Sequence, residues 1–420
     1  MAISRNTAAI VVVLLIIVGV GGYYIDPDPE SGRFETITIV APWDAGTGEK
    51  DAFLPTLSEF TARTGIQVKY VTSRAEDLIV TLPLEFAAGT TTGDVIFMTA
   101  SDVRQFFLDG HAVDVTDLID ADAFPGFFNK EISIDGTFYG GMYTGSMKPG
   151  FWYRPSIFEA KGWTGLVPPA TLADFKSLLD LIKAEGSFEA PIASGNGVGW
   201  PLSDTTEAFI IGLGGPELHR QLQNDEIRWT DPAVVAVFEE LVSFIEAGYF
   251  SEPDAFDVQF ARLWAGDLAM YFQGSFALTF AAIEDPSDLN FFPFPGTTGA
   301  IGSPNYFFVS SYSEHPDEAK QLFQWLVSAD AQAISAQLPG IIAFHSGIDP
   351  NTITSPTNQR LLTFATTIEY LNDLDDTLGQ PYQGVFWSQL QLLWVSPESL
   401  DDVLAALNDA QDAHIAAMGG

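Results

Sequence analysis

The chain has 420 residues, of which 47% are hydrophobic and 13% aromatic, and its 55 acidic residues outnumber 18 basic ones to give a formal net charge of −37. A charge of this sign and size repels nucleic acid, anionic lipid and phosphorylated ligands, so it excludes nucleic-acid binding and favours a neutral or cationic ligand. The chain has no cysteine, so neither a disulfide nor a lipid-modified cysteine is expected. Charged residues total only 17%, which is typical of a folded protein whose acidic surface suits a salt-rich or an acidic medium.

The N-terminal segment indicates export. Residues 8–25 are apolar or small throughout, with Arg5 before them and several carboxylates after them. About 18 such residues are near the lower limit for spanning a bilayer and slightly above the usual length of a secretory signal's apolar region. Residues 1–25 are therefore predicted to be a membrane anchor or a cleaved signal, and the charge bias places the rest of the chain outside. Residues 26–33 are predicted to be a short acidic linker.

Strand and helix patterns alternate in the first hundred residues. The predicted elements are, in chain order, a strand over 34–41, a helix carrying Phe53, Leu57 and Phe60, a strand over 66–71, a helix over 75–88 and a strand in TTTGDVIFM. This alternation predicts an α/β layered domain with a largely parallel sheet.

Three later helices have clear starting signals. They are predicted to follow Thr171, Asp231-Pro232 and His315-Pro316, and to continue to about residues 184, 247 and 328. Beyond the leader, about 390 residues remain, which is more than a single small domain usually holds. Two or more lobes are expected.

No pattern in the sequence predicts catalysis, a cofactor or a metal. The five histidines lie singly, GTGEK lacks the Gly-Lys-Ser/Thr ending of a phosphate loop, and SGNGVGW does not fit the dinucleotide fingerprint. The adjacent carboxylates Glu239-Glu240 and Asp375-Asp376 are predicted to lie on solvated faces, whereas acid/base chemistry needs two carboxylates that converge across a cleft.

Aromatic residues at breaks in the pattern are the better candidates for binding. A flat aromatic ring suits the C–H face of a sugar, and Asp, Asn and Ser side chains can satisfy its hydroxyls. Any one of these rings can instead belong to the core, so only a set that converges in space would indicate a ligand site. The candidates, each beside Gly, Pro, Asp or Asn, are Trp43, Trp200, Phe276, Tyr306 and Trp387.

Several segments, in order, are similar to a known family. AAGTTTGDVIFMTASDVRQFFLDGHAVDVTDLID resembles a stretch of the extracellular solute-binding proteins of ATP-binding-cassette (ABC) importers. DGTFYGG, FWYRPSIFEAKGW, GDLAMYFQGSFAL and HPDEAKQLFQWLVSADAQ are similar to further segments of that family, although Arg154-Pro155 replaces its usual Asn-Lys. The resemblance covers about 34–340. YQGVFWSQLQLLWVSPESLDDVLAALNDAQDAHI is similar to the C-terminal segment of oligosaccharide-binding members, of the maltodextrin-binding kind.

The resemblance implies an α/β periplasmic-binding-protein fold of type II, with a ligand cleft between two lobes. The boundaries it implies are three hinge crossings near 142–146, 290–295 and 328–343, a first lobe of 34–143 plus 293–330, and a second lobe of 144–292 plus 331–420. A solute that binds both lobes shifts the population toward a closed form, which a membrane permease can read.

The resemblance also implies a set of ligand-binding residues. Trp387 and Phe276 match aromatic residues that stack on sugar in relatives, and Gly274 belongs to the matching segment before Phe276. Trp200 matches a tryptophan whose loop lines the sugar site, and the three rings are predicted to form an aromatic platform. Ser101-Asp102 stands where maltodextrin binders have an Asp-Arg pair, which removes a forked donor. The opposing wall is predicted to contain Trp43, Asp44, Ser101, Asp102, Asn305 and Tyr306.

The predicted function is therefore capture of a sugar or oligosaccharide outside the cytoplasmic membrane and its delivery to an ABC permease, by a monomer without cofactor or enzymatic activity. A polyamine- or ferric-iron-binding protein of the same fold is the alternative, since acidic and tyrosine side chains suit both ligands. A surface-anchored carbohydrate-active enzyme is a further alternative, and it requires two carboxylates about 5 to 10 Å apart across the site.

Overall fold

The computed structural model describes residues 35–43, 48–73, 75–98, 100–196, 199–280, 283–379 and 381–418. The predicted leader and linker, and the predicted site residue Asp44, lie outside these ranges, as do the side chains of Ser101 and Asp102. Within the part of the chain that is described, no helix combines the length and the apolar character needed to cross a membrane.

The first half of the molecule is built around a six-stranded sheet. Its strands are β1 (Thr36–Ala41), β2 (Gln67–Thr72), β3 (Val95–Met98), β6 (Gly140–Lys148), β13 (Gly299–Val309) and β14 (Glu369–Leu371). The order is β14-β13-β3-β1-β2, with β6 also paired to β13. β1 is parallel to β2 and β3, but β13 runs antiparallel to β3 and β6. The three predicted strands are confirmed, and they are parallel to one another as expected. The whole sheet is mixed, because β13 returns from the second half and enters it in the opposite direction.

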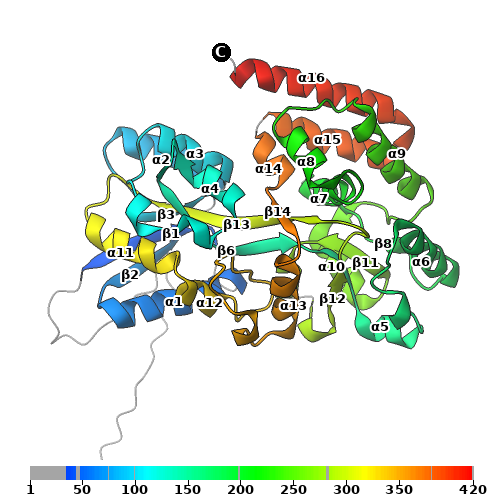
Figure 1. Cartoon of the computed structure of the whole chain (residues 1–420), viewed down its shortest axis with the longest axis horizontal. Helices are drawn as coiled ribbons and strands as arrows, with labels where there is room; N and C mark the ends of the chain where they lie inside the picture. The colour runs from blue at the N-terminus through cyan, green and yellow to red at the C-terminus, as the bar shows by residue number, and fades with distance from the viewer. Residues whose placement is uncertain are drawn as a thin grey trace, which may run out of the picture.

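Helices cover both faces of this sheet. Figure 1 shows α2 (Ala75–Ala87), α3 (Ala100–Leu108) and α4 (Gly126–Ile132) above it, and α1 (Gly48–Thr64), α11 (Pro316–Leu326) and α12 (Ala329–Ser335) below it. The predicted apolar face of α1 is confirmed, since Phe53, Leu57 and Phe60 are all buried in the core. Such a helix gains its stability from this buried stripe rather than from helix propensity alone.

The second half contains a four-stranded sheet of order β12-β7-β11-β8. Its strands are β7 (Gly150–Tyr153), β8 (Ala190–Ile192), β11 (Leu268–Gln273) and β12 (Asn290–Phe292). Side chains alternate across it: Trp152 joins one core cluster, whereas Phe151 and Tyr153 join the other. The main helices around it are α6 (Leu172–Glu185), α7 (Trp200–Phe209), α8 (Gly215–Gln223), α9 (Pro232–Glu246), α10 (Phe256–Ala265), α15 (Tyr382–Val395) and α16 (Leu400–Met418).

The predicted helix starts are confirmed. Thr171 caps α6 through a reciprocal pair of hydrogen bonds with Asp174, and the Asp231 side chain accepts from the Ala233 amide at the start of α9. These caps satisfy amides that have no partner within the helix.

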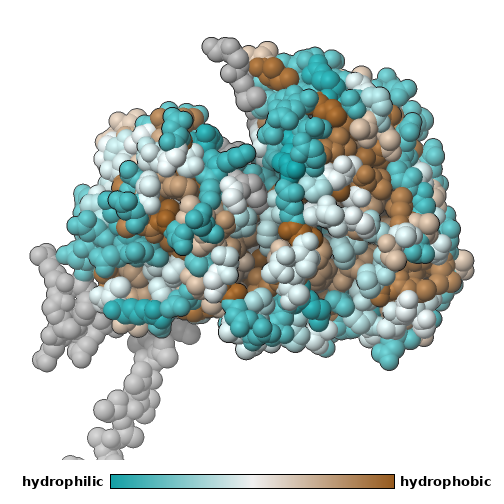
Figure 2. All heavy atoms as spheres, viewed as in Figure 1, coloured by the Kyte–Doolittle hydropathy of each residue, from teal (hydrophilic) through white to brown (hydrophobic). Residues whose placement is uncertain are grey.

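The chain passes three times between the two sheets. β6 leads into β7 through Pro149, β12 leads into β13 through residues 293–298, and β14 leads into α14 (Leu374–Leu378) through residues 372–373. Residues 369–371, which the sequence analysis places in the second lobe, pair with β13 in the first sheet. The division into two lobes that move separately stays a prediction. Figure 2 shows a hollow between the two halves on the face it displays.

Candidate functional site

A cavity of about 250 Å³ is lined by residues from both halves of the molecule. The first sheet contributes the loop after β1 and the middle of β6 and β13, and the second half contributes the turn after β11 and the start of α14. Its lining residues are Pro42, Trp43, Glu49, Phe97, Met98, Gly145, Ser146, Phe276, Gly302, Ser303, Pro304, Asn305, Tyr306, Gly340, Ile341, Asn372, Asp373, Asp376 and Thr377.

Aromatic rings form much of the cavity wall. Trp43 lies half-buried with its ring 5.1 Å from that of Phe97 and 5.1 Å from that of Phe53, measured between centroids. Its carbonyl accepts a hydrogen bond of 2.9 Å from the Tyr70 hydroxyl, which fixes the loop after β1. On the other side, Phe276 lies with its ring 6.0 Å from that of Trp200. Edge and tilted contacts of this kind hold aromatic rings in fixed orientations.

Polar oxygens without partners lie in the same wall. The Ser303 and Tyr306 hydroxyls are buried, and neither has a hydrogen-bond partner among the described residues. A buried polar atom left unpaired costs about 1–3 kcal/mol. Two such hydroxyls in residues that line one cavity are groups that a bound molecule can satisfy.

Asn305 is presented by an irregularity in the sheet. The pairing of β13 with β6 shifts register between Pro304 and Tyr306, where Asn305 alone lies opposite two residues of β6, Tyr143 and Thr144, so the extra residue of the bulge is on β6. Its side-chain amide donates to the carbonyl of Thr144 on β6. Bulges re-aim side chains in this way and are frequent beside binding sites.

The structure brings together four of the predicted site residues, namely Trp43, Phe276, Asn305 and Tyr306. Trp200, Gly274 and Trp387 are not among the lining residues, although Trp200 contacts Phe276. Asp44 and the side chains of Ser101 and Asp102 lie outside the described residues. That any of these residues contacts a solute stays a prediction.

Trp387 lies within α15 and is held from two sides. Its indole N–H donates to Asp375 Oδ2 at 2.6 Å. Gly199, at φ +95°, lies against the ring so closely that a Cβ there would be 2.5 Å from Trp387 atoms. Gly274 makes similar room, because a Cβ would lie 2.2 Å from the Phe276 ring. Glycine at these two positions allows the aromatic residues their observed places.

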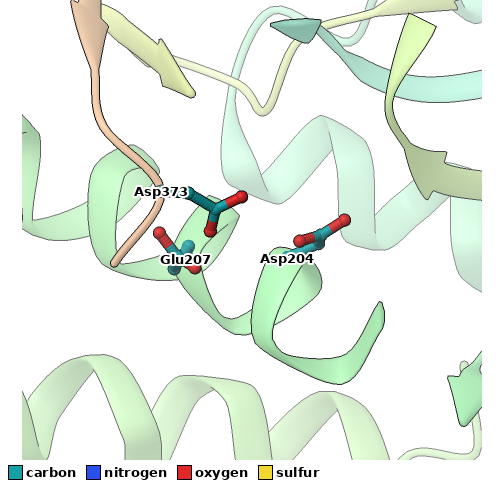
Figure 3. A group of neighbouring side chains, drawn as sticks. All are labelled: Asp204, Glu207 and Asp373. Atoms are coloured by element: carbon teal, nitrogen blue, oxygen red, sulfur yellow. The ribbon is translucent and has the colours of Figure 1, made fainter. Parts of the chain in front are cut away.

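A buried acidic cluster adjoins the cavity. Figure 3 shows Asp373 reaching from the segment after β14 toward α7, which carries Asp204 and Glu207. The Lys148 ammonium at the end of β6 donates to both Asp204 and Asp373, and these three side chains are only 6%, 0% and 9% exposed. Glu207 Oε2 lies 2.8 Å from His219 Nε2.

The charges in this cluster are set by burial and by Lys148. Burial raises the pKa of Asp204 and of Glu207 well above the usual range, which favours the protonated form of both. Burial would also raise the pKa of Asp373, but the Lys148 ammonium, together with hydrogen bonds from Asp375 and Glu207, outweighs burial and lowers that pKa. Burial lowers the pKa of His219 to about 4, which keeps the ring neutral. The shifts favour ionisation of Lys148 and Asp373 and oppose ionisation of the other groups.

The cluster has the spacing of a metal site but not its chemistry. Oxygens of Asp204, Glu207 and Asp373 lie within 4.8 Å of one another. However, the Lys148 ammonium already donates to two of the three carboxylates, so it supplies the positive charge that a cation would. We interpret the group as an acidic cluster neutralised by lysine.

One prediction about the acidic residues was wrong. Asp375 is only 2% exposed and accepts the Trp387 indole N–H, whereas Asp376, its neighbour, is exposed. The short helix α14 packs against α8 and α15 and turns one side of the acidic run inward. The Asp375-Asp376 pair therefore does not lie on a wholly solvated face.

Two α/β halves, three passages between them and a cavity lined from both define a two-lobed binding protein. The chain belongs to the bacterial extracellular solute-binding protein family, whose family model matches residues 43–333. An uncharacterized ABC transporter extracellular-binding protein of Pyrococcus horikoshii is 37% identical over 377 residues, which are 89% of this chain and 88% of that protein.

Solved structures of sugar-binding proteins share the fold. The bacterial solute receptor AcbH, described as having an exclusive preference for β-D-galactopyranose, matches with a TM-score of 0.75 at 18% identity, over 90% of this chain and 99% of that one. A chitin oligosaccharide binding protein matches with a TM-score of 0.73 at 20% identity, over 91% and 99%. The predicted fold and family are confirmed.

Proposed function

We propose that this protein is the extracytoplasmic solute-binding subunit of an ABC importer and that it captures a sugar or oligosaccharide. The observation that carries the proposal is the combination, in one cavity, of aromatic rings with buried oxygens that have no partner. Rings of Trp43 and Phe276 suit the C–H face of a sugar, and the Ser303 and Tyr306 hydroxyls suit its hydroxyl groups. The sugar-binding proteins of the same fold support this assignment.

The charge of the cavity limits the solute further. The described lining residues include the carboxylates of Glu49, Asp373 and Asp376 and no Lys, Arg or His. Closing the cavity over an anionic solute would bring like charges together without a compensating cation, which is unfavourable. A neutral or cationic solute fits, and a phosphorylated sugar does not.

A polyamine is the second candidate, because the same carboxylates and aromatic rings suit an ammonium group. Ferric iron is less well supported. Iron sites rely on phenolate or carboxylate oxygens, and Tyr306 is the one tyrosine among the described lining residues. Burial raises the pKa of Tyr306 well above its usual range, which disfavours the phenolate.

The proposed mechanism is closure of the two halves around the solute. A solute held first by one half gains contacts with the other only in the closed form, so binding shifts the population toward closure. The permease then distinguishes the closed from the open form. We propose that no covalent chemistry occurs, that the protein acts as a monomer, and that residues 1–25 direct export and hold it at the membrane or are removed.

The test is a titration of the purified protein followed by tryptophan fluorescence and thermal unfolding. The panel contains galactose, maltotriose, raffinose and di-N-acetylchitobiose, with spermidine and ferric citrate as rival ligands. A ligand at 100 times its Kd stabilises the fold by about 2.7 kcal/mol, which raises the Tm of a chain of this length by about 3 °C. A response to a sugar that is lost in Phe276→Ala supports the proposal. A response to spermidine or ferric citrate alone contradicts it.

A further inference from the structure

One part of the cavity wall is a loop without regular secondary structure. This loop, residues 336–344, follows α12, and its Gly340 and Ile341 line the cavity. The next residue, Ile342, forms two backbone hydrogen bonds of 2.8 Å with Gly145 of β6. The loop is therefore paired with the first sheet immediately beside the residues that it contributes to the cavity.

A single buried side chain, Asn358 on α13 (Pro356–Ala365), holds the loop from the other side. It is fully buried, and its Oδ1 accepts a hydrogen bond of 2.8 Å from the Gly340 amide. Its Nδ2 lies 2.6–3.1 Å from three loop carbonyls, those of Ala336, Leu338 and Ile341. A side-chain amide has two N–H donors and one carbonyl oxygen, so most of its hydrogen-bonding capacity is used on this loop.

The loop is also attached to the second half of the molecule. α13 lies beside β12 (Figure 1), and the Phe364 ring is 5.7 Å from the Phe291 ring, measured between centroids. The Ser275 hydroxyl, in the turn after β11, donates to the Gly340 carbonyl at 2.7 Å. Gly340 has φ +85°, and a Cβ there would lie 2.5 Å from the Ser275 carbonyl oxygen, so this close approach requires glycine.

We infer that Asn358 is a positioning residue of the solute site, which holds Gly340 and Ile341 in place as a wall of the cavity without touching the solute. The inference rests on the proposed function and concerns a residue that does not itself line the cavity. The backbone amides and carbonyls of Gly340 and Ile341 are all hydrogen-bonded within the protein. This wall therefore offers the solute a fixed shape, and a wall that is ordered in advance lowers the entropic cost of binding.

Gln332 on α12 provides a matched control. It is fully buried, and its side-chain amide is also hydrogen-bonded to three backbone groups, namely the Met142 carbonyl and the amides of Phe344 and His345. None of these residues lines the cavity. Truncating either Gln332 or Asn358 leaves buried backbone groups without partners and should lower stability. Only the truncation of Asn358 should also weaken binding.

The experiment compares N358A with Q332A by calorimetric titration, using the sugar of the panel that stabilises the wild type most, or spermidine if only spermidine does. N358A should raise Kd about tenfold, because the solute must then order two wall residues, whereas Q332A should raise it less than about threefold. Hydrogen exchange followed by mass spectrometry gives a readout in the protein without added ligand. Exchange at 336–342 should become about tenfold faster in N358A and change less than about threefold in Q332A.

Should N358A fail to fold, Gly340→Ala replaces it, with Gly266→Ala as the control. Gly266 ends α10 at φ +87° and is not among the cavity residues, and a Cβ there would come no closer than 3.5 Å to its neighbours. Alanine is strained at both positions, but only at 340 would it also push the loop away from Ser275. G340A should therefore raise Kd about tenfold and G266A less than about threefold.

The outcomes separate this inference from the proposed function. An N358A variant that is less stable but binds as tightly as the wild type would overturn the positioning role, and so would equal losses of affinity in N358A and Q332A. A wild type that binds spermidine and no sugar overturns the sugar proposal, and the same comparison with spermidine still tests Asn358. Unchanged exchange at 336–342 in N358A overturns the inference whichever ligand binds. Loss of affinity and of protection in N358A alone supports it.

Discussion

Replacing Lys148 with methionine should destabilise the protein strongly at neutral pH. The change removes the only ammonium within hydrogen-bond reach of Asp204 and Asp373 among the described residues, and leaves a carboxylate with almost no access to water. Without the ammonium, Asp373 must be protonated to stay buried. Holding a proton at pH 7 on a group with an unfolded pKa near 3.9 costs about 4 kcal/mol, and at pH 5 it costs about 1.5 kcal/mol.

The pH dependence follows from the sign of the shift. In the wild type, Lys148 lowers the pKa of Asp373, so the stability from this pair is present above the unfolded pKa and is lost as the pH falls through the folded value. In K148M the pKa of Asp373 is raised instead, so the variant regains stability as the pH falls toward about 4. The difference between the two proteins should therefore shrink from pH 7 to pH 5.

Urea unfolding followed by tryptophan fluorescence at both pH values measures this difference. Lys176→Met is the control, because Lys176 pairs with Glu240 at side-chain exposures of 36% and 24%. An exposed pair of this kind is worth about 1 kcal/mol or less. The reasoning is refuted if K148M and K176M cost the same, or if the cost of K148M is independent of pH.

Three further predictions concern local features. Thr171→Ala removes the reciprocal cap of α6 and should cost about 1 kcal/mol in urea unfolding, whereas an unchanged midpoint would mean that water replaces the cap. Burial lowers the pKa of His219 to about 4, so between pH 6.5 and 4 the imidazole is protonated in the unfolded chain but neutral in the native state. The wild type should lose about 3 kcal/mol as the pH falls from about 6.5 to 4, and His219→Gln should lack that component of the profile. Gly199→Ala should lower the Tm, because the new Cβ would lie 2.5 Å from Trp387 atoms and because φ at this position is +95°. A Tm equal to that of the wild type would contradict this reasoning, since it would mean that α15 moves away without loss of stability.

The sequence predicted the outer elements of the fold well, because their signals are local. Periodic apolar residues predicted α1, and side-chain caps next to proline or after threonine predicted where α6 and α9 begin. The direction of β13 was not predictable in this way. Whether a strand enters a sheet parallel or antiparallel depends on which half the chain has just left, and no local pattern records that.

Two of the predicted residues that line the cavity stand where the family resemblance and a break in regular structure coincide. Trp43, in the loop after β1, and Asn305, at the bulge between β13 and β6, are both of this kind, and both line the cavity. Trp387 shows the limit of such reasoning. This predicted stacking residue lies inside α15, and its indole N–H donates to Asp375. It is not among the residues that line the cavity.

Asp373 shows why the rest of the site could not be predicted. In LNDLDD it is one acidic residue among several, and in a chain with 55 acidic residues such a run is ordinarily a solvated surface. Its importance depends on Lys148, which lies 225 positions earlier in the chain. A single sequence carries no signal for a pair so distant.

α7 extends this argument from one residue to a whole helix. Its sequence, WPLSDTTEAF, is half polar and would ordinarily be assigned a solvent-facing side, yet every residue from Pro201 to Phe209 is buried. The cost of burying those polar groups is offset locally: Thr205 and Thr206 donate to carbonyls one turn earlier, and Asp204 receives the Lys148 ammonium. Polar patterning thus predicts exposure only where water is the sole available partner. At the junction of the two halves, Lys148 and backbone carbonyls replace water as hydrogen-bond partners of the polar side chains of α7. A helix whose sequence resembles that of a surface helix is therefore buried beside the cavity.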